Sequence, residues 1–119
     1  MAGVKFIEHN GKKILYVDLA ESDLEILAMV VEETQALISK QPLNSVLTLT
    51  DVSGIRVHGM ISKVAKQFTE YNRPFVKAGA IIGLDHPRTN DFKQIMQYSK
   101  RDFKICETAQ EAIEWLSAQ

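Results

Sequence analysis

The chain has 119 residues, of which 45% are hydrophobic and 24% charged, with a formal net charge of −1. This length fits one domain, and the composition is that of an ordinary folded globular protein. The small net charge excludes the bulk basic excess with which proteins bind nucleic-acid phosphates, so we expect no nucleic-acid partner. The single cysteine, Cys106, excludes an intrachain disulfide and a cysteine zinc site.

No apolar run is long enough to cross a bilayer, and the N-terminus passes into a strand pattern without the hydrophobic stretch of a signal peptide. We therefore expect a cytoplasmic protein. No internal repeat, low-complexity tract or linker divides the sequence. Residues 1–119 are accordingly expected to form a single domain.

Two short apolar runs, residues 4–8 and 13–18, open the chain. Between them stands Asn10-Gly11, and both residues tolerate the positive φ that a tight hairpin turn requires. The pattern predicts an antiparallel hairpin at the N-terminus.

A first helix is expected to follow. Ser22 and Glu25 have the spacing of a capping box, in which Ser22 caps the helix and Glu25 reaches back. The helix should end near Lys40, since a residue before a proline disfavours helix. Its inner face, read from helical spacing, is expected to consist of Leu24, Leu27, Ala28, Val31 and Ile38.

The centre of the chain reads as a strand–helix–strand unit, with strands at residues 46–50 and 76–83 and a helix at 59–71. Both strand segments are nearly continuous apolar runs, which is typical of parallel strands that are buried on both faces. The buried face of the helix is expected to consist of Ile61, Val64, Ala65, Phe68 and Tyr71.

The last third of the chain predicts helix, strand and helix. Asp85 is a suitable N-cap and Pro87 fits the first turn of a helix with Phe92, Ile95, Met96 and Ser99 inward. A short strand at 102–106 follows. Thr108 and Glu111 then form a second capping box, and the final helix should turn Ala109, Ala112, Ile113 and Leu116 inward. The predicted order is ββαβαβαβα, an α/β domain with a mixed, mostly parallel five-stranded sheet and four helices.

Three segments, at residues 46–55, 73–83 and 108–116, resemble the SpoIIAA-like proteins, which are related in fold to the STAS domains of anti-sigma-factor antagonists. The resemblance covers nearly the whole chain and rests on strand and turn signatures. It implies a SpoIIAA-like (STAS-like) fold, which the lipid-binding CRAL-TRIO domains also share. Strand and turn signatures indicate a fold more than an activity, so the resemblance does not indicate a substrate.

In the antagonists, a partner kinase phosphorylates a serine at the start of the helix after the central strand. The matching positions here are residues 56–59, and none of them carries a hydroxyl group. Ser53 lies before the helix and Ser62 lies inside it, so neither matches. The resemblance therefore does not extend to the phosphorylation switch.

The loop after the central strand holds the first candidate site. Asp51, Ser53, Arg56 and His58 lie at the carboxyl end of a strand, where ligands of open α/β sheets usually bind. Free N–H groups at Gly59 would bind an anion, with help from Arg56 or protonated His58. The alternative is that Asp51 and Ser53 only bond the backbone of their own loop.

Asp85 and His86 follow the next strand and are expected at the same edge of the sheet, where His86 could approach His58. Such a group would suit a divalent metal or an acid–base pair, but its spacing is not diagnostic. The chain has no G-x-S-x-G elbow, P-loop or G-x-G-x-x-G motif. We predict no metal, no cofactor and no catalysis, and a small hydrolase or metal-dependent enzyme is the least favoured hypothesis.

A group of aromatic and methionine residues allows two interpretations. These side chains could pack as ordinary core, or they could line an apolar cleft between the second and third helices that admits an acyl chain. The candidates are Met60, Phe68, Tyr71, Phe75, Phe92 and Met96.

The leading hypothesis is a non-catalytic binding or regulatory module. It would dock a protein partner or a small apolar ligand through the loop after the central strand and the second and third helices. The alternative is a carrier of lipid or another hydrophobic ligand. Lys63 and Lys66 share a helical face that would meet an acidic partner, an anionic membrane surface or only solvent. The sequence leaves monomer and homodimer open.

Overall fold

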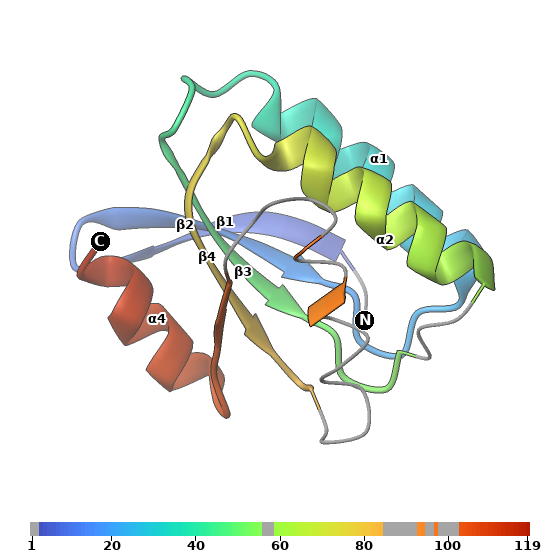
Figure 1. Cartoon of the computed structure of the whole chain (residues 1–119). Coiled ribbons are helices and arrows are strands. Elements are labelled where there is room, and N and C mark those ends of the chain that lie inside the picture. Colours follow the sequence, from blue (N-terminus) through green and yellow to red (C-terminus); the bar gives the residue numbers. More distant parts are fainter. Residues whose placement is uncertain (1–2, 56–58, 85–92, 95–96, 98–102) are drawn as a thin grey trace.

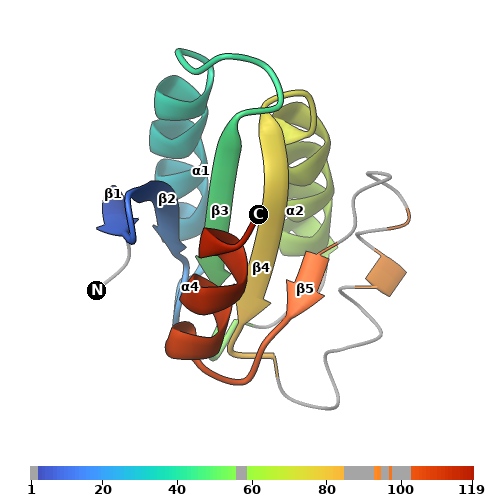
Figure 2. The same ribbon diagram turned by 90° about the vertical axis from the view of Figure 1, so that its left-hand side faces the viewer.

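The computed structural model describes residues 3–55, 59–84, 93–94, 97 and 103–119. Within them, one sheet separates two layers of helix. Helices α1 (Leu24–Ile38) and α2 (Gly59–Asn72) run side by side on one face, and α4 (Ala109–Ser117) covers the other (Figures 1 and 2). The domain is therefore a three-layer α/β arrangement.

The sheet has the strand order β1-β2-β3-β4-β5. Its strands are β1 (Gly3–His9), β2 (Lys12–Asp18), β3 (Val46–Asp51), β4 (Val76–Ile82) and β5 (Phe103–Ile105). β1 pairs antiparallel with β2, and all other neighbours are parallel. The predicted mixed, mostly parallel five-stranded sheet is confirmed.

The predicted N-terminal hairpin is confirmed as well. Asn10 and Gly11 have φ values of 51° and 78°, and His9 pairs with Lys12 across the turn. Both turn residues thus adopt the left-handed conformation, which asparagine tolerates and which glycine, lacking a Cβ, adopts at little cost.

The number and order of the helices differ from the prediction. The described residues contain three helices in the order ββαβαββα, in place of four in the order ββαβαβαβα. The difference arises because the predicted third helix falls on residues 85–102, of which only Lys93, Gln94 and Gln97 are described, with helical backbone. The predicted cap at Asp85 and the inner face around Ile95 lie outside the described residues.

The start of α1 corrects the predicted cap. Asp23, not Ser22, caps the helix, since its Oδ1 accepts a hydrogen bond of 2.9 Å from the N–H of Ile26. Aspartate and serine cap helices about equally well, so two adjacent candidates could not be separated by spacing. Ser22 instead closes a tight turn, because its N–H donates to the carbonyl of Leu19 at 3.1 Å.

The inner faces of both long helices are rotated from the predicted ones. In α1 the predicted Leu24 and Ala28 are exposed, and in α2 the predicted Tyr71 is 45% exposed. The buried sets are Leu27, Val30, Val31, Thr34 and Ile38 in α1, and Ile61, Phe68 and Asn72 in α2. Each helix packs against both the sheet and the other helix. Its buried face is therefore rotated away from the face that the spacing of hydrophobic residues alone predicts.

The predicted cap of the last helix is confirmed. The Thr108 hydroxyl oxygen accepts a hydrogen bond of 3.1 Å from the N–H of Glu111. Ala112 and Leu116 are fully buried against the sheet, whereas Ala109 and Ile113 are half-buried. This short helix thus docks through a narrow apolar stripe.

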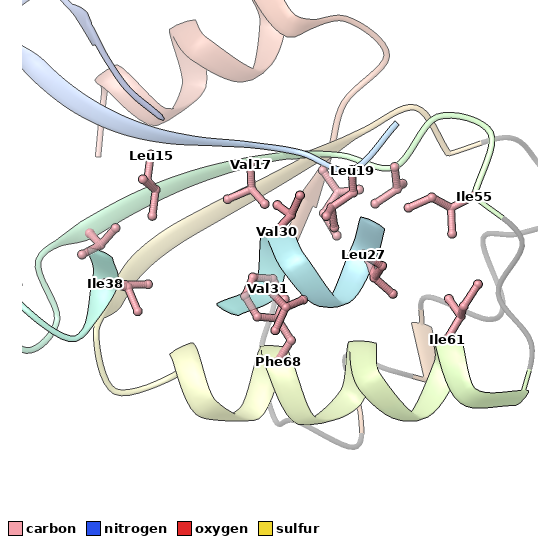
Figure 3. Packing of buried hydrophobic residues seen from close by; sticks show 13 residues of the cluster. Leu15, Val17, Leu19, Leu27, Val30, Val31, Ile38, Ile55, Ile61 and Phe68 are labelled. Carbon is pink, nitrogen blue, oxygen red and sulfur yellow. The ribbon is translucent and has the colours of Figure 1, made fainter. Parts of the chain in front are cut away.

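Two apolar clusters form the core, one on each face of the sheet. The larger lies under α1 and α2, as Figure 3 shows for residues such as Val17, Val31 and Phe68. The smaller lies under α4 and includes Leu47 and Leu49 of β3. Burial of alternate β3 residues in the two clusters confirms that β3 is a central strand.

Gly79 of β4 allows β5 to approach. A Cβ at this position would lie 2.8 Å from the ring of Phe103 and 2.9 Å from Thr48 Oγ1. We expect Gly79→Ala to lower the free energy of unfolding by about 1–3 kcal/mol, the usual effect of overpacking. Urea denaturation measures the change. Gly3→Ala is the control, since a Cβ there meets nothing within 4 Å; equal losses in both variants would contradict the packing argument.

Candidate functional site

The loop after β3 is held together by its own side chains. Asp51 Oδ1 accepts hydrogen bonds from the Ser53 N–H at 2.9 Å and from the Ser53 hydroxyl at 2.6 Å. Gly83, with φ 86°, leaves no space for a Cβ beside these atoms. The polar groups of Asp51 and Ser53 are therefore engaged in shaping a turn packed against the end of β4, which is the structural alternative that the sequence left open.

The other predicted members of this site, Arg56, His58, Asp85 and His86, lie outside the described residues. The expected approach of His58 and His86 stays a prediction. Among the residues that the structure describes, no group of three or more histidine, cysteine, aspartate or glutamate side chains could hold a metal ion.

Two strand-end carboxylates stand side by side where sequence reasoning singled out only one. Asp18 and Asp51 are register partners at the ends of β2 and β3. Tyr16 lies two residues before Asp18, and its pKa is raised by partial burial first and by Asp51 and Asp18 second. The signal that would have found the pair is that Asp18 and Asp51 each stand at the carboxyl end of an apolar strand segment, and neighbouring parallel strands end at the same edge of the sheet.

The raised pKa of Tyr16 predicts how the stability of the protein changes at alkaline pH. Because its pKa in the folded protein lies above the ordinary 10.0, the fold favours the neutral phenol. The resulting stability is fully present below pH 10.0 and is lost as the pH rises through the raised pKa. We expect Tyr16→Phe to lose less stability than the wild type on alkalinisation, as measured by urea unfolding at neutral and alkaline pH. Tyr71→Phe is the control, and an identical alkaline loss in wild type and Tyr16→Phe would refute the assignment.

An open groove lies between the starts of α1 and α2, with about 400 Å³ of space. We call it the helix-start groove, and it is lined by Glu21, Ser22, Asp23, Leu24, Gly54, Met60 and Ile61. The two helices begin at the same edge of the sheet because each follows a parallel strand (Figure 1). The groove thus joins the loop after β3 to both helices.

Three features of the helix-start groove suit a ligand. Leu24 and Met60 are 38% and 56% exposed, which leaves apolar surface open to solvent. The Ser22 hydroxyl is buried and has no hydrogen-bond partner among the described residues. Glu21 and Asp23 add carboxylates, and no basic side chain in the described part of the chain lines the groove.

Glu21 is held in an unusual backbone conformation at this groove. Its φ is 59°, a left-handed value that few residues other than glycine and asparagine adopt. Its N–H donates to the Ser53 carbonyl at 2.7 Å, and its carboxylate covers Gly54, where a Cβ would overlap it. The loops after β2 and β3 therefore support each other, and sequence spacing offered no signal for this contact.

The described candidates for an apolar cleft do not share one. Phe68 is buried in the core, while Met60 lines the helix-start groove and Tyr71 is exposed. Phe75 is half-buried, with its ring 6.3 Å from that of Tyr71. Phe75 also packs against the cluster that holds Phe68, whereas Met60 is exposed at the other end of α2. The remaining candidates, Phe92 and Met96, lie outside the described residues.

Comparison with known proteins bears on the fold. No protein-family model matches the chain, and no match was found among curated proteins. A crystal structure of an uncharacterized DUF3478-family protein from Shewanella loihica PV-4, with a SpoIIAA-like fold, is similar at a TM-score of 0.76. The match covers 98% of this chain and 95% of the other, at 13% identity. The SpoIIAA-like fold suggested by the sequence is thus confirmed.

In the ranges that the structure describes, no helix combines the length and the apolar character that crossing a bilayer requires.

Proposed function

We propose that this chain is a non-catalytic binding module that docks a protein partner at the helix-start groove. The partner would insert an apolar side chain between Leu24 and Met60 and place lysine or arginine residues near Glu21 and Asp23. The observation that carries the proposal is the coincidence of exposed apolar surface, an unpaired buried hydroxyl and carboxylates in one groove.

The apolar contacts would supply most of the affinity. Fully burying a leucine or methionine side chain contributes about 1.5–3 kcal/mol. Because Leu24 and Met60 are partly exposed in this structure, a partner that covers them would gain part of this free energy on binding. A donor or acceptor from the partner would pair with the Ser22 hydroxyl, which otherwise stays unpaired at a cost in stability. In typical protein interfaces, too, a few buried contacts near the centre supply most of the binding free energy.

The carboxylates would select the partner. Glu21, Asp23 and Glu25 stand at or beside the groove at the start of α1. Positive charge on the partner would speed its association with these carboxylates, and the same carboxylates would repel acidic partners. Such charge complementarity contributes more to association rate and specificity than to affinity. A basic segment with one apolar anchor is therefore the chemistry that this groove fits.

The two alternative functions gain less support. An acyl chain needs a pocket of about 300 Å³ or more that covers most of its surface, whereas the cavity beneath the helices has about 50 Å³ and the helix-start groove, with about 400 Å³, is open to solvent. A hydrolase at Ser53 would need a base beside the hydroxyl, yet that hydroxyl donates to Asp51 within its own turn. Neither observation favours a carrier or an enzyme over a docking module.

Synthetic peptides with one leucine between two arginines are the probe for this proposal. We expect them to shift the amide NMR signals of Leu24, Gly54 and Met60, and to bind less tightly as salt rises. The same peptides with glutamate in place of arginine should not bind. Leu24→Gln and Met60→Gln should each weaken binding by roughly tenfold, which corresponds to about 1.4 kcal/mol.

Met29→Gln is the matched control, because Met29 is 57% exposed on α1 but does not line the groove. If Met29→Gln weakens binding as much as Met60→Gln, the peptides bind exposed apolar surface in general, and the assignment to the groove fails. Binding that is equal for the arginine and glutamate peptides would contradict the role of the carboxylates.

A further inference from the structure

A second, internal space lies beneath the helices, apart from the helix-start groove. This inner cavity of about 50 Å³ lies between β2, β3, β4 and β5 on one side and α1 and α2 on the other. Its walls are mostly apolar side chains such as Val31, Ile61 and Phe68, which Figure 3 shows in the layer between sheet and helices. A cavity of this size is large enough to hold water or a very small molecule.

Two polar side chains, Thr48 and Asn72, lie in the wall of the inner cavity. Thr48 and Asn72 are only 4% and 2% exposed, and both line the cavity. Neither Thr48 Oγ1 nor Asn72 Oδ1 has a partner among the described residues. Since a buried unpaired oxygen lowers stability, such groups are normally satisfied. A group inside the cavity would satisfy them here.

Other threonines in the same layer show that the fold pairs buried hydroxyls elsewhere. Thr34 Oγ1 donates to the Val30 carbonyl at 2.7 Å. Thr69, which lines the same cavity, donates to the carbonyls of Ala65 and Lys66 at 3.1 and 3.0 Å. A threonine in a helix can donate to the carbonyl one turn earlier. Thr48 lies in a strand, where the backbone carbonyls accept hydrogen bonds from the neighbouring strands. A valine would keep the shape of Thr48 without the unpaired group.

We propose that the inner cavity binds a small, uncharged molecule that carries a hydroxyl group. The size of the cavity limits the molecule to a few carbon atoms, and the absence of charged side chains from its described lining disfavours an ion. A hydroxyl group can donate to Asn72 Oδ1 and can either donate to or accept from Thr48 Oγ1. The apolar walls would surround the rest of the molecule. The cavity and the helix-start groove share Ile61 in their linings, but Thr48 and Asn72 line only the cavity and Leu24 and Met60 only the groove, so either proposal can fail without the other.

Methyl-labelled protein titrated with 2-propanol tests the proposal. We expect saturable shifts of the Val31 and Ile81 methyl signals, because these residues line the cavity and not the helix-start groove. Thr48→Val should weaken the binding of 2-propanol by roughly tenfold, as expected for one lost hydrogen bond. Thr69→Val is the matched control: it removes a hydroxyl from the same cavity, but one that is already paired within α2, and it should bind 2-propanol like the wild type.

Xenon separates a polar site from an apolar void, since it fills cavities but forms no hydrogen bonds. We expect Thr48→Val to bind xenon at least as well as the wild type. Asn72→Leu should also weaken 2-propanol binding, which keeps the test decisive if Thr48→Val fails to fold. Two results would overturn the proposal: unchanged alcohol binding in folded Thr48→Val or Asn72→Leu, or nuclear Overhauser contacts that place only water beside Ile81 while no alcohol binds.

Discussion

The whole domain depends on β3 being buried on both faces. Val46, Leu47, Thr48 and Leu49 are each at most 5% exposed, and the strand pairs in parallel with β2 on one side and β4 on the other. Because successive side chains point to opposite faces, one short strand contributes to both apolar clusters at once. Helices must then cover both faces, which explains the α1–α2 layer on one side and α4 on the other.

Parallel pairing also creates the candidate functional edge. β2 and β3 end side by side, so the loops after them meet and α1 and α2 start next to each other. Glu21 and Ser53 bond across these loops, and the Asp51–Ser53 turn packs against Gly83. The loops beneath the groove are therefore held in place by hydrogen bonds and close packing, while the apolar side chains of Leu24 and Met60 are exposed to solvent.

The SpoIIAA-like fold occurs here without the hydroxyl residue on which the antagonists' switch relies. Among the described residues, buried polar atoms without a hydrogen-bond partner occur elsewhere: in Ser22 at the helix-start groove, and in Thr48 and Asn72 at the inner cavity. A fold alone does not define function, and unpaired buried polar groups are among the features in which one member of a fold can differ from another. In this chain such groups line both the helix-start groove and the inner cavity.

The sequence by itself determined the sheet, the hairpin turn at Asn10-Gly11 and the cap at Thr108, because hydrophobic period, turn residues and capping spacing act over a few neighbouring residues. It also indicated the SpoIIAA-like fold. Only the tertiary structure decided that Asp23 caps α1, that Leu24 and Tyr71 face outward, and that Ser22, Gly54 and Met60 share a groove. Those outcomes depend on how α1 and α2 pack against each other and the sheet, a contact between distant segments that no local pattern records.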